Sequence, residues 1–326
     1  MISRLNVGSD ISKKWFDAHA LLKGREAFTA RYPNDPRGHR LFIDELRSFG
    51  ARKVHVCMEY TGGCERALAV ACREAGFVVS IVDGAKIAKF RGSFSSTGAA
   101  SDRKSACLLA RFCRERRPEE WFPAPDEFRK LRELVRHRES LVEARSQWKC
   151  RASNEVEDPL VHAQRRALIE TCDAMVKEVE REIGEHVEAH GNLAEAVRLL
   201  RTIPGVAATS AVRILAEMGQ VENYSSAKEL ALAAGLVPIV VGSGQKAPPG
   251  KLAVYGNKEL RNSLYYPSLV GKRFGTGVGP FIARVESRSR FKMTAVVAGM
   301  RKLCHVVYGV LSTGQPFDPQ KMTMIA

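Results

Sequence analysis

The chain has 326 residues, of which 45% are hydrophobic and 27% are charged. These ordinary globular values exclude a wholly disordered protein. Lysine and arginine number 51 against 36 acidic residues, which gives a net charge of +15 and favours a polyanionic partner, with nucleic acid ahead of an anionic membrane surface.

The chain exceeds a typical single domain in length, so we expect two globular parts and a connecting element. It has no uninterrupted apolar run of about 18 residues, and its N-terminus, MISRLNVGSD, lacks the apolar core of a signal peptide. We therefore expect a cytoplasmic protein that has no membrane partner. Eight cysteines are scattered without a CxxC pair, which indicates reduced, mostly buried thiols rather than zinc ligands or disulfides.

The N-terminal residues predict a parallel α/β unit. Arg4 to Ala18 predicts a strand that reaches Asp10, a polar bend and the second arm of a hairpin. Residues 38–49 have helical spacing, and 53–60 alternate as a strand that reaches Glu59. A helix over 64–76 and a buried strand over 77–83 complete the unit.

Carboxylates at strand ends favour a ligand site, because α/β sheets bind ligands at the C-terminal ends of their strands. Each has a simpler interpretation as well. Asp10 suits a turn, Glu59 suits an exposed strand end, and Asp102, which follows a small polar loop over 91–101, suits a helix N-cap. If the three converge, their repulsion requires a cation such as Mg²⁺ or Mn²⁺, which usually serves phosphodiester chemistry.

The middle of the chain predicts a helical hairpin. Charge and three prolines over 114–125 close the first domain, and apolar stripes begin at Glu127 and after Pro159. These two helices could coil with each other or with another protomer. The first arm is basic and the second acidic, so ion pairing across the hairpin and contact with nucleic acid both remain open.

The C-terminal part predicts further helices and one irregular segment. Two helices flank the turn Ile203-Pro204-Gly205-Val206, either as an ordinary pair or as a helix-hairpin-helix that meets a DNA phosphate. A short helix spans 226–235, and within the irregular segment 236–256 Ser243 lies between two glycines. This serine fits either a flexible loop or a close phosphate approach.

Basic side chains surround these elements. Helices over 257–270 and 293–311 are separated by a basic segment, and we expect the tail from Gly314 to be loosely ordered. Phosphate contact and simple solubility both explain the cations, and the net charge favours phosphate contact. The candidate nucleic-acid-binding residues are Lys246, Lys251, Arg273, Arg288 and Arg290.

Six motifs occur in order: GSDISKKWFDA, VCMEYTGG, SDRKSACLLARFCRERRP, LLRTIPGV, AGLVP followed by GSG, and GMRKLCHVVYGVLSTGQPFD. Together they resemble the DEDD transposases of the insertion-sequence one-ten family, the bridge-RNA-guided recombinases, over nearly the full chain. The resemblance implies a mixed α/β and α fold with a RuvC-like, ribonuclease-H-like domain over 1–125, a coiled-coil hairpin over 126–193 and a mostly helical transposase domain over 194–326.

The resemblance also implies a site and its partners. It assigns Mg²⁺ or Mn²⁺ to Asp10, Glu59 and Asp102, and makes Ser243 the nucleophile of a covalent phosphoserine linkage with DNA. Donor and target DNA, a structured guide RNA and a homo-oligomer, dimer or tetramer, follow as partners. The protein would then be prokaryotic and associated with the nucleoid when it acts.

One position departs from the family pattern. A fourth carboxylate is expected three residues after Asp102, where this chain has Ser105. Positions i and i+3 share a helix face, so Ser105 would face the same metal with a weaker, neutral ligand. Natural tolerance, deliberate inactivation and a shifted motif remain open.

Two other functions also remain open. One is a RuvC-like hydrolytic DNA nuclease that uses a metal-activated water. The other is a nucleic-acid-binding scaffold whose catalysis is weakened by Ser105.

Overall fold

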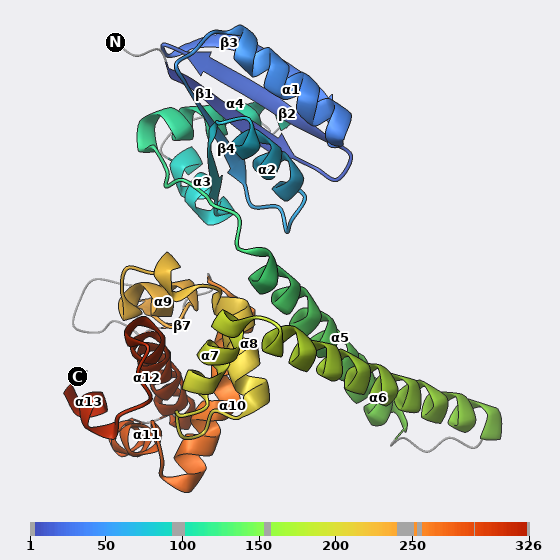
Figure 1. Ribbon diagram of the computed structural model, residues 1–326, viewed down its shortest axis with the longest axis vertical. Coiled ribbons are helices and arrows are strands. Elements are labelled where there is room, and N and C mark those ends of the chain that lie inside the picture. Colours follow the sequence, from blue (N-terminus) through green and yellow to red (C-terminus); the bar gives the residue numbers. More distant parts are fainter. Residues whose placement is uncertain are drawn as a thin grey trace. The chain divides into compact units, whose positions relative to one another are not determined.

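The computed structural model describes residues 4–92, 102–152, 158–239, 251–252, 256–289 and 291–324, and within these ranges it leaves out the side chains of 102–104, 239, 251–252 and 322–324. The chain divides into two compact units, Met1–Pro123 and Ala124–Ala326 (Figure 1). Each unit is described by itself below.

The first unit is built on a five-stranded sheet in the order β3-β2-β1-β4-β5. Its strands are β1 (Arg4–Ile11), β2 (Trp15–Leu22), β3 (Arg25–Pro33), β4 (Lys53–Glu59) and β5 (Val78–Val82). Strands β1, β4 and β5 are parallel, and β2 and β3 are antiparallel additions. The predicted parallel unit is therefore present, extended by a meander because the short turns at both ends of β2 allow only antiparallel pairing.

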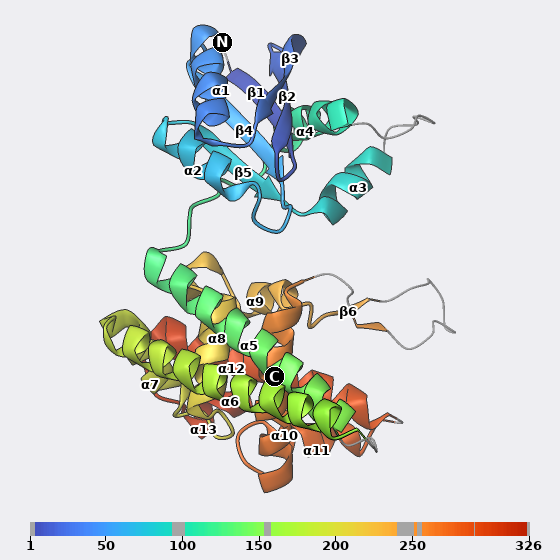
Figure 2. The same ribbon diagram turned by 90° about the vertical axis from the view of Figure 1, so that its right-hand side faces the viewer.

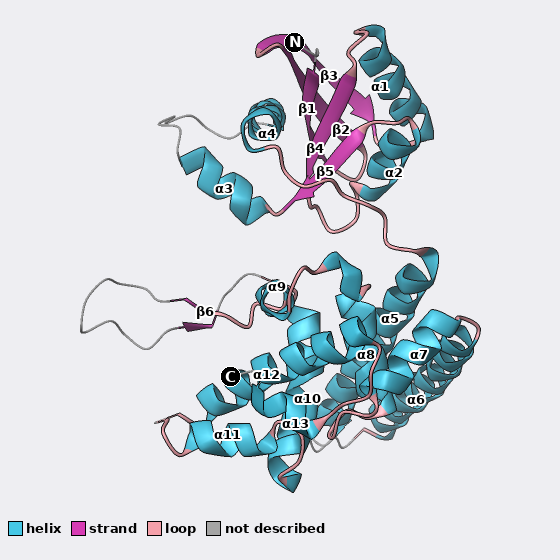
Figure 3. Ribbon diagram, turned by 60° about the vertical axis from the view of Figure 1, so that its left-hand side comes forward, coloured by secondary structure: helices cyan, strands magenta, loops and turns pink. Residues whose placement is uncertain are grey.

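Helices cover both faces of this sheet. Figure 3 shows α1 (Pro36–Ser48) and α2 (Arg66–Glu74) on one face and α4 (Asp102–Arg116) on the other. The face under α1 and α2 holds the larger core of this unit, where Phe16 packs against the rings of Tyr32 and Phe42 at centroid distances of 5.3 and 5.2 Å. Helix α3 (Gly84–Gly92) follows β5 and buries Ile87 and Phe90 against α4.

The second unit begins with two long helices, α5 (Asp126–Ala152) and α6 (Pro159–Glu188), which lie side by side (Figure 2). They are antiparallel, because Lys130, Arg138 and Arg145 pair with Glu182, Glu180 and Asp173 in that order. Ion pairing across the hairpin, one of the two open interpretations of its charges, is thus present. The bases of both helices share one core with the helices that follow, through Leu131, Val135 and Ile183.

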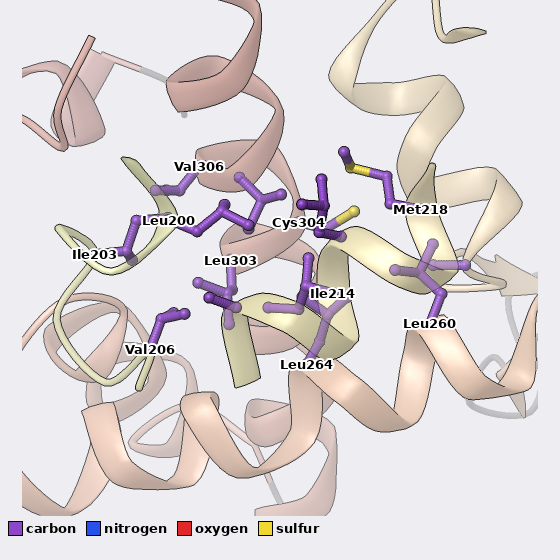
Figure 4. Close-up of a cluster of buried hydrophobic side chains, with 14 of the residues drawn as sticks. Leu200, Ile203, Val206, Ile214, Met218, Leu260, Leu264, Leu303, Cys304 and Val306 are labelled. Atoms are coloured by element: carbon purple, nitrogen blue, oxygen red, sulfur yellow. The ribbon is translucent and has the colours of Figure 1, made fainter. Parts of the chain in front are cut away.

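The rest of the second unit is helical around that core. Its elements are α7 (Gly191–Leu200), α8 (Ala208–Met218), the 3₁₀ turn η1 (Val221–Asn223), α9 (Ala227–Ala233), the strand pair β6 (Pro238–Ile239) and β7 (Lys251–Leu252), α10 (Lys258–Phe274), α11 (Gly279–Glu286), α12 (Lys292–Thr313) and α13 (Pro319–Met324). Figure 4 shows Leu200, Ile214, Leu264, Leu303 and neighbouring side chains meeting between α7, α8, α10 and α12.

Several elements differ from the sequence prediction. Strand β3 and helices α3 and α11 were not predicted, and the tail expected to be loose contains α13. The backbone N–H of Phe317 in this tail donates a 2.8 Å hydrogen bond to the Thr202 hydroxyl. The expectation of a loose tail was wrong as far as Met324, because the hydrogen bond to Thr202 is a tertiary contact that the local sequence does not reveal.

One described helix, α12, is long and apolar enough to cross a membrane by length and composition. Its apolar run is interrupted by Arg301 and Lys302, and 56% of its apolar window is buried inside the protein. A helix that is apolar on most sides is also what the core of a large helical unit requires.

All eight cysteines lie among the described residues, and no disulfide joins any two of them. Cys57, Cys72, Cys113 and Cys304 are buried, three others are half-buried and Cys150 is exposed. Burial raises the pKa of the Cys113 and Cys304 thiols to about 12, so these two remain protonated and unreactive at neutral pH.

Candidate functional site

Two of the predicted carboxylates are neighbours on adjacent strands. The parallel register of β1 and β4 runs from Arg4 beside Lys53 to Ser9 beside Met58, and the next pair in this register is Asp10 and Glu59. Parallel strands lie about 4.8 Å apart, and residues in register point to the same face. Both side chains are half-buried, so their carboxylates share one face of the sheet and remain accessible.

That face is the one covered by α4. Gly8, two residues before Asp10, lies against this helix so closely that a Cβ would collide with the backbone of Ala106 and Ala110. Two residues earlier in β1, Asn6 lies near the thiol of Cys113 in α4. The same thiol lies 3.4 Å from the carbonyl oxygen of His55 in β4. These contacts show that β1 and α4 run in opposite directions here, so the end of β1 that carries Asp10 is the end nearer the start of α4.

The first turn of α4 carries the other two predicted positions. The helix begins at Asp102, whose side chain lies outside the described residues, and Ser105 follows in the same turn and is half-buried. The backbone thus brings all four motif positions to one region of the first unit.

The Glu59 carboxylate is held where β5 meets α3. The backbone N–H of Tyr60 donates to the carbonyl of Val82 at 2.9 Å, and Asp83 caps the start of α3 by accepting from the N–H of Ala85 at 2.7 Å. Glu59 Oε1 fills the space that a side chain at Gly84 would occupy. Glycine at position 84 therefore allows the carboxylate to lie against the start of α3.

The donor set suits a hard divalent cation. Asp10 and Glu59 supply carboxylate oxygens, the ligands that Mg²⁺ and Mn²⁺ prefer. Within the ranges that the structure describes, no cluster of three or more His, Cys, Asp or Glu side chains has metal-binding geometry.

Asp17 and its partner Arg31 were not among the residues predicted from the sequence. Asp17 is paired with Asp10 in the β1–β2 register and is only 2% exposed. Arg31 donates to both carboxylate oxygens of Asp17, at 3.1, 3.2 and 2.6 Å. The signal was an aspartate at an inward position of a strand that is otherwise apolar from Phe16 to Leu21 except for His19.

The predicted nucleophile belongs to the second unit. Ser243 and Lys246 lie outside the described residues, between β6 and β7, whose register pairs Pro238 with Leu252 and Ile239 with Lys251. Lys251 is placed in β7 by its backbone alone. The chain segment that carries Ser243 thus begins and ends at one strand pair.

The residues that flank that segment are also in direct contact with each other. The N–H of Asn257 donates to the carbonyl of Ala233 at 2.6 Å, and a Cβ on Gly256 would come within 2.8 Å of the same carbonyl oxygen. Arg301 donates to the carbonyl of Leu236 at 3.1 Å. The segment between Leu236 and Gly256 therefore leaves and re-enters the unit at one place, which we call the segment base and define as Ala233–Leu236 with Gly256–Asn257.

A buried glutamate connects this base to the helical hairpin. Glu217, at the end of α8, is 4% exposed. It accepts from Arg136 of α5 at 2.7 and 2.9 Å and from the side-chain amide of Asn257 at 3.0 Å. Burial alone would raise the pKa of Glu217, but the hydrogen bonds from Arg136 and Asn257 outweigh it and leave the pKa below its usual value.

The two helices predicted around the turn Ile203-Pro204-Gly205-Val206 are present as α7 and α8, and both interpretations of them, an ordinary pair and a helix-hairpin-helix, remain open. Gly205 has φ +95° and packs on the carbonyl of Pro267 in α10. The first turn of α8 has neither a side-chain cap nor an acidic residue, and it opens onto a hollow of about 380 Å³ lined by Arg201, Pro204, Gly205, Ser210 and Tyr266, among others. This shape is compatible with phosphate contact.

Of the remaining predicted cations, Arg273 and Arg288 are exposed, and Arg290 lies outside the described residues. Arg273 is in the last turn of α10 and Arg288 follows α11, and a 2.8 Å ion pair between Lys272 and Glu286 joins the ends of these two helices. Arg273 and Arg288 therefore lie on two chain segments whose neighbouring residues are in contact.

Comparison with known proteins covers both units. A family model described as a transposase, of the DEDD type in IS110 elements, matches residues 7–157, and one described as the transposase IS116/IS110/IS902 family matches residues 197–280. The first implies a ribonuclease-H-like fold for the sheet unit and, typically, use of a divalent metal. These matches agree with the resemblance found in the sequence motifs.

Two similar proteins span nearly the whole chain. They are named pilin gene-inverting protein: the one from Moraxella lacunata is 27% identical over 325 residues, and the one from Moraxella bovis is 28% identical over 323 residues, each covering 97% of this chain and 98% of the relative. A transposase for insertion sequence element IS1328 from Yersinia enterocolitica is 30% identical over 89 residues, or 27% of this chain and 25% of that protein. The chain belongs to the IS110 family of transposases, DNA-rearranging enzymes.

Proposed function

We propose that this transposase cuts and rejoins DNA through a covalent phosphoserine at Ser243, with a divalent cation held by Asp10, Glu59 and Asp102. The observation that carries the proposal is the register that sets Asp10 beside Glu59 on the face where α4 begins. Like charges so placed repel each other unless a cation lies between them. Mg²⁺ is the proposed ion and Mn²⁺ the substitute.

In the proposed reaction the Ser243 hydroxyl loses its proton and attacks a DNA phosphorus. An Oγ–P bond forms, the bond from phosphorus to one sugar oxygen breaks, and that oxygen leaves as a hydroxyl after it takes up a proton. Rejoining reverses these steps with a new sugar hydroxyl and restores the serine. The bound cation would supply charge stabilisation on the phosphate oxygens.

The same proposal includes an RNA guide and a homo-oligomer, a dimer or a tetramer. The net charge of +15 supports polyanionic partners. The outer part of α6 exposes Leu160, Leu168 and Met175 at 65%, 41% and 46%, which supports packing of the hairpin, as a coiled coil, against a second copy. The three-part division at 125/126 and 193/194 is proposed as the functional division, although the hairpin base shares its core with the C-terminal helices.

The decisive experiment tests for the covalent linkage. Purified protein with its copurified nucleic acid is incubated with labelled donor and target DNA and Mg²⁺, and protein–DNA adducts are separated on denaturing gels. Ser243→Ala should abolish the adduct, whereas Ser287→Ala, at an exposed serine outside the motifs, should retain it. An adduct that persists in Ser243→Ala refutes the assignment, and adduct-free cleavage by that variant supports a hydrolytic nuclease instead.

Ser105 favours one competing function, a nucleic-acid-binding scaffold that is inert with Mg²⁺. In a naturally active enzyme, Ser105→Asp should leave the rate of adduct formation little altered. A rise of several tenfold steps would identify a weakened site.

The guide is tested by sequencing the nucleic acid that copurifies with the protein. A discrete structured RNA supports RNA guidance, and bulk degraded RNA counts against it.

A further inference from the structure

One ion pair with a buried carboxylate lies beside the candidate metal site without being part of it. Asp17 has a side-chain exposure of 3%, while its partner Arg31 is 48% exposed. Burying a carboxylate costs free energy, and well-packed apolar residues in place of a buried ion pair are often as stable or more stable. Stability alone therefore gives a weak account of an aspartate at this position.

The position of the pair is set by strand register. Asp17 is opposite Asp10 in the β1–β2 ladder and opposite Arg31 in the β2–β3 ladder, and Glu59 continues the row on β4. Residues opposite each other in a sheet have Cβ atoms about 4.5–5.5 Å apart and point to the same face. A single row across four strands thus reads Arg31, Asp17, Asp10, Glu59, all on the face covered by α4.

In this row Asp17 is one strand from Asp10, and the Arg31 side chain reaches from the next strand to the Asp17 carboxylate, at 2.6–3.2 Å from its oxygens. A cation at Asp10 and Glu59 would therefore be attracted by Asp17 and repelled by Arg31. Asp17 is shielded from water, so its effect is screened less than that of a surface charge. The two residues have opposite effects on the same site.

We propose that Asp17 and Arg31 are positioning residues that set the cation affinity of the site at Asp10 and Glu59. Asp17 strengthens cation binding, and Arg31 both holds the Asp17 carboxylate in place and limits the charge that it contributes. The inference rests on the proposed metal site. Asp17 would give this chain a negative charge near the metal that is not part of the motif. The motif itself has one carboxylate fewer because position 105 is a serine.

The test measures Mn²⁺ binding to the full chain by electron paramagnetic resonance, without DNA. Asp17→Asn should weaken binding about three- to tenfold, and Arg31→Gln should tighten it by a similar factor, as expected for one charge at this separation in a partly screened site. The double variant should return close to the original affinity. Thermal unfolding of each variant reports on folding separately.

A matched control has the same charge changes on a surface pair of the same unit. Asp44 and Arg47 of α1 lie 3.9 Å apart and are 73% and 58% exposed, so Asp44→Asn and Arg47→Gln should leave Mn²⁺ affinity within about twofold because solvent screens them. If the control variants changed the Mn²⁺ affinity as much as the Asp17 or Arg31 variants do, net charge alone would explain the effect, and the inference would be overturned.

A purely structural pair predicts a different pattern. Both single variants would then lower the unfolding temperature and the Mn²⁺ affinity in the same direction, and that result would overturn the inference while leaving the metal site intact. Asp10→Asn separates the two proposals: loss of Mn²⁺ binding supports the site, whereas unchanged binding overturns the site and this inference with it. If Asp17→Asn does not fold, tightening in Arg31→Gln decides the question.

Discussion

Replacing Glu217 with glutamine should destabilise the second unit, because this side chain connects α5, α8 and the start of α10. The substitution keeps the shape of the side chain but removes its charge, so Arg136 loses a bidentate carboxylate at 2.7 and 2.9 Å. Glutamine also presents a donor where Asn257 now donates at 3.0 Å. The variant should unfold at lower temperature while keeping the same fold.

The magnitude follows from burial. Breaking a fully buried ion pair costs about 3–5 kcal/mol, whereas the side chain of Arg136 is 49% exposed and can turn to solvent. The substitution weakens two hydrogen bonds to a charged group that is partly screened by solvent, so the free energy of unfolding should fall by about 2–3 kcal/mol. In a unit of about 200 residues this corresponds to a melting temperature lower by about 4–12 °C.

Differential scanning calorimetry checks this value, with Glu222→Gln as the control because Glu222 is an exposed glutamate on the neighbouring 3₁₀ turn. The pH dependence adds a second readout. The folded pKa of Glu217 lies below its usual value, so the stabilisation is complete above about pH 4.3, the unfolded value, and is lost as the pH falls through the folded pKa. A melting temperature no lower than that of Glu222→Gln at pH 7 would refute the reasoning.

Three further predictions concern packing, pH and the segment base. Gly8→Ala should lower the stability of the first unit by about 1–3 kcal/mol, because the added methyl group would overpack against α4. Gly184→Ala, at an open position inside α6, should instead raise the stability of the second unit by about 1 kcal/mol. Urea unfolding measures both free energies, and equal effects of the two substitutions would contradict the packing argument. Burial, helped by Arg4, lowers the pKa of His55 to about 4, so the first unit should lose stability as the pH falls from about 6.5 toward that value. His55→Gln should flatten this part of a melting-temperature profile, and an unchanged profile would assign the loss to other groups. Gly256→Ala, at φ +98°, should slow adduct formation more than it lowers the melting temperature, whereas normal adduct formation would show that the base does not position Ser243.

The sequence predicted what depends on local pattern. Alternation and helical spacing predicted β1, β4, β5 and most long helices, and they put Asp10 and Glu59 each at a strand end. That the two carboxylates are neighbours depends on the register of β1 and β4. Strand β3 was missed because REAFTARYP mixes charged and apolar residues on a partly exposed edge strand. Helix α3 was missed because its first glycine and short length weaken the periodic signal.

Contacts between distant residues could not be predicted in the same way. The pairing of Asp17 with Arg31 depends on two ladder registers, and the contact of Arg136 with Glu217 joins residues far apart in sequence through the packing of α5 on α8. In each case the local pattern shows only a charged residue at an inward or helical position. Which charge neutralises it is decided by tertiary structure.

The two parts of the proposed chemistry are therefore held in different ways. The carboxylates of Asp10 and Glu59 are fixed by sheet register, so a one-residue slip of β1 against β4 would send one of them to the opposite face. The segment that carries Ser243 instead depends on its base, where the carbonyl of Ala233 accepts from Asn257 and the side chain of Asn257 reaches Glu217. Changes in the strands should thus act mainly on cation affinity, and changes around Glu217 mainly on the attacking serine. The Mn²⁺ and adduct measurements read these two quantities separately.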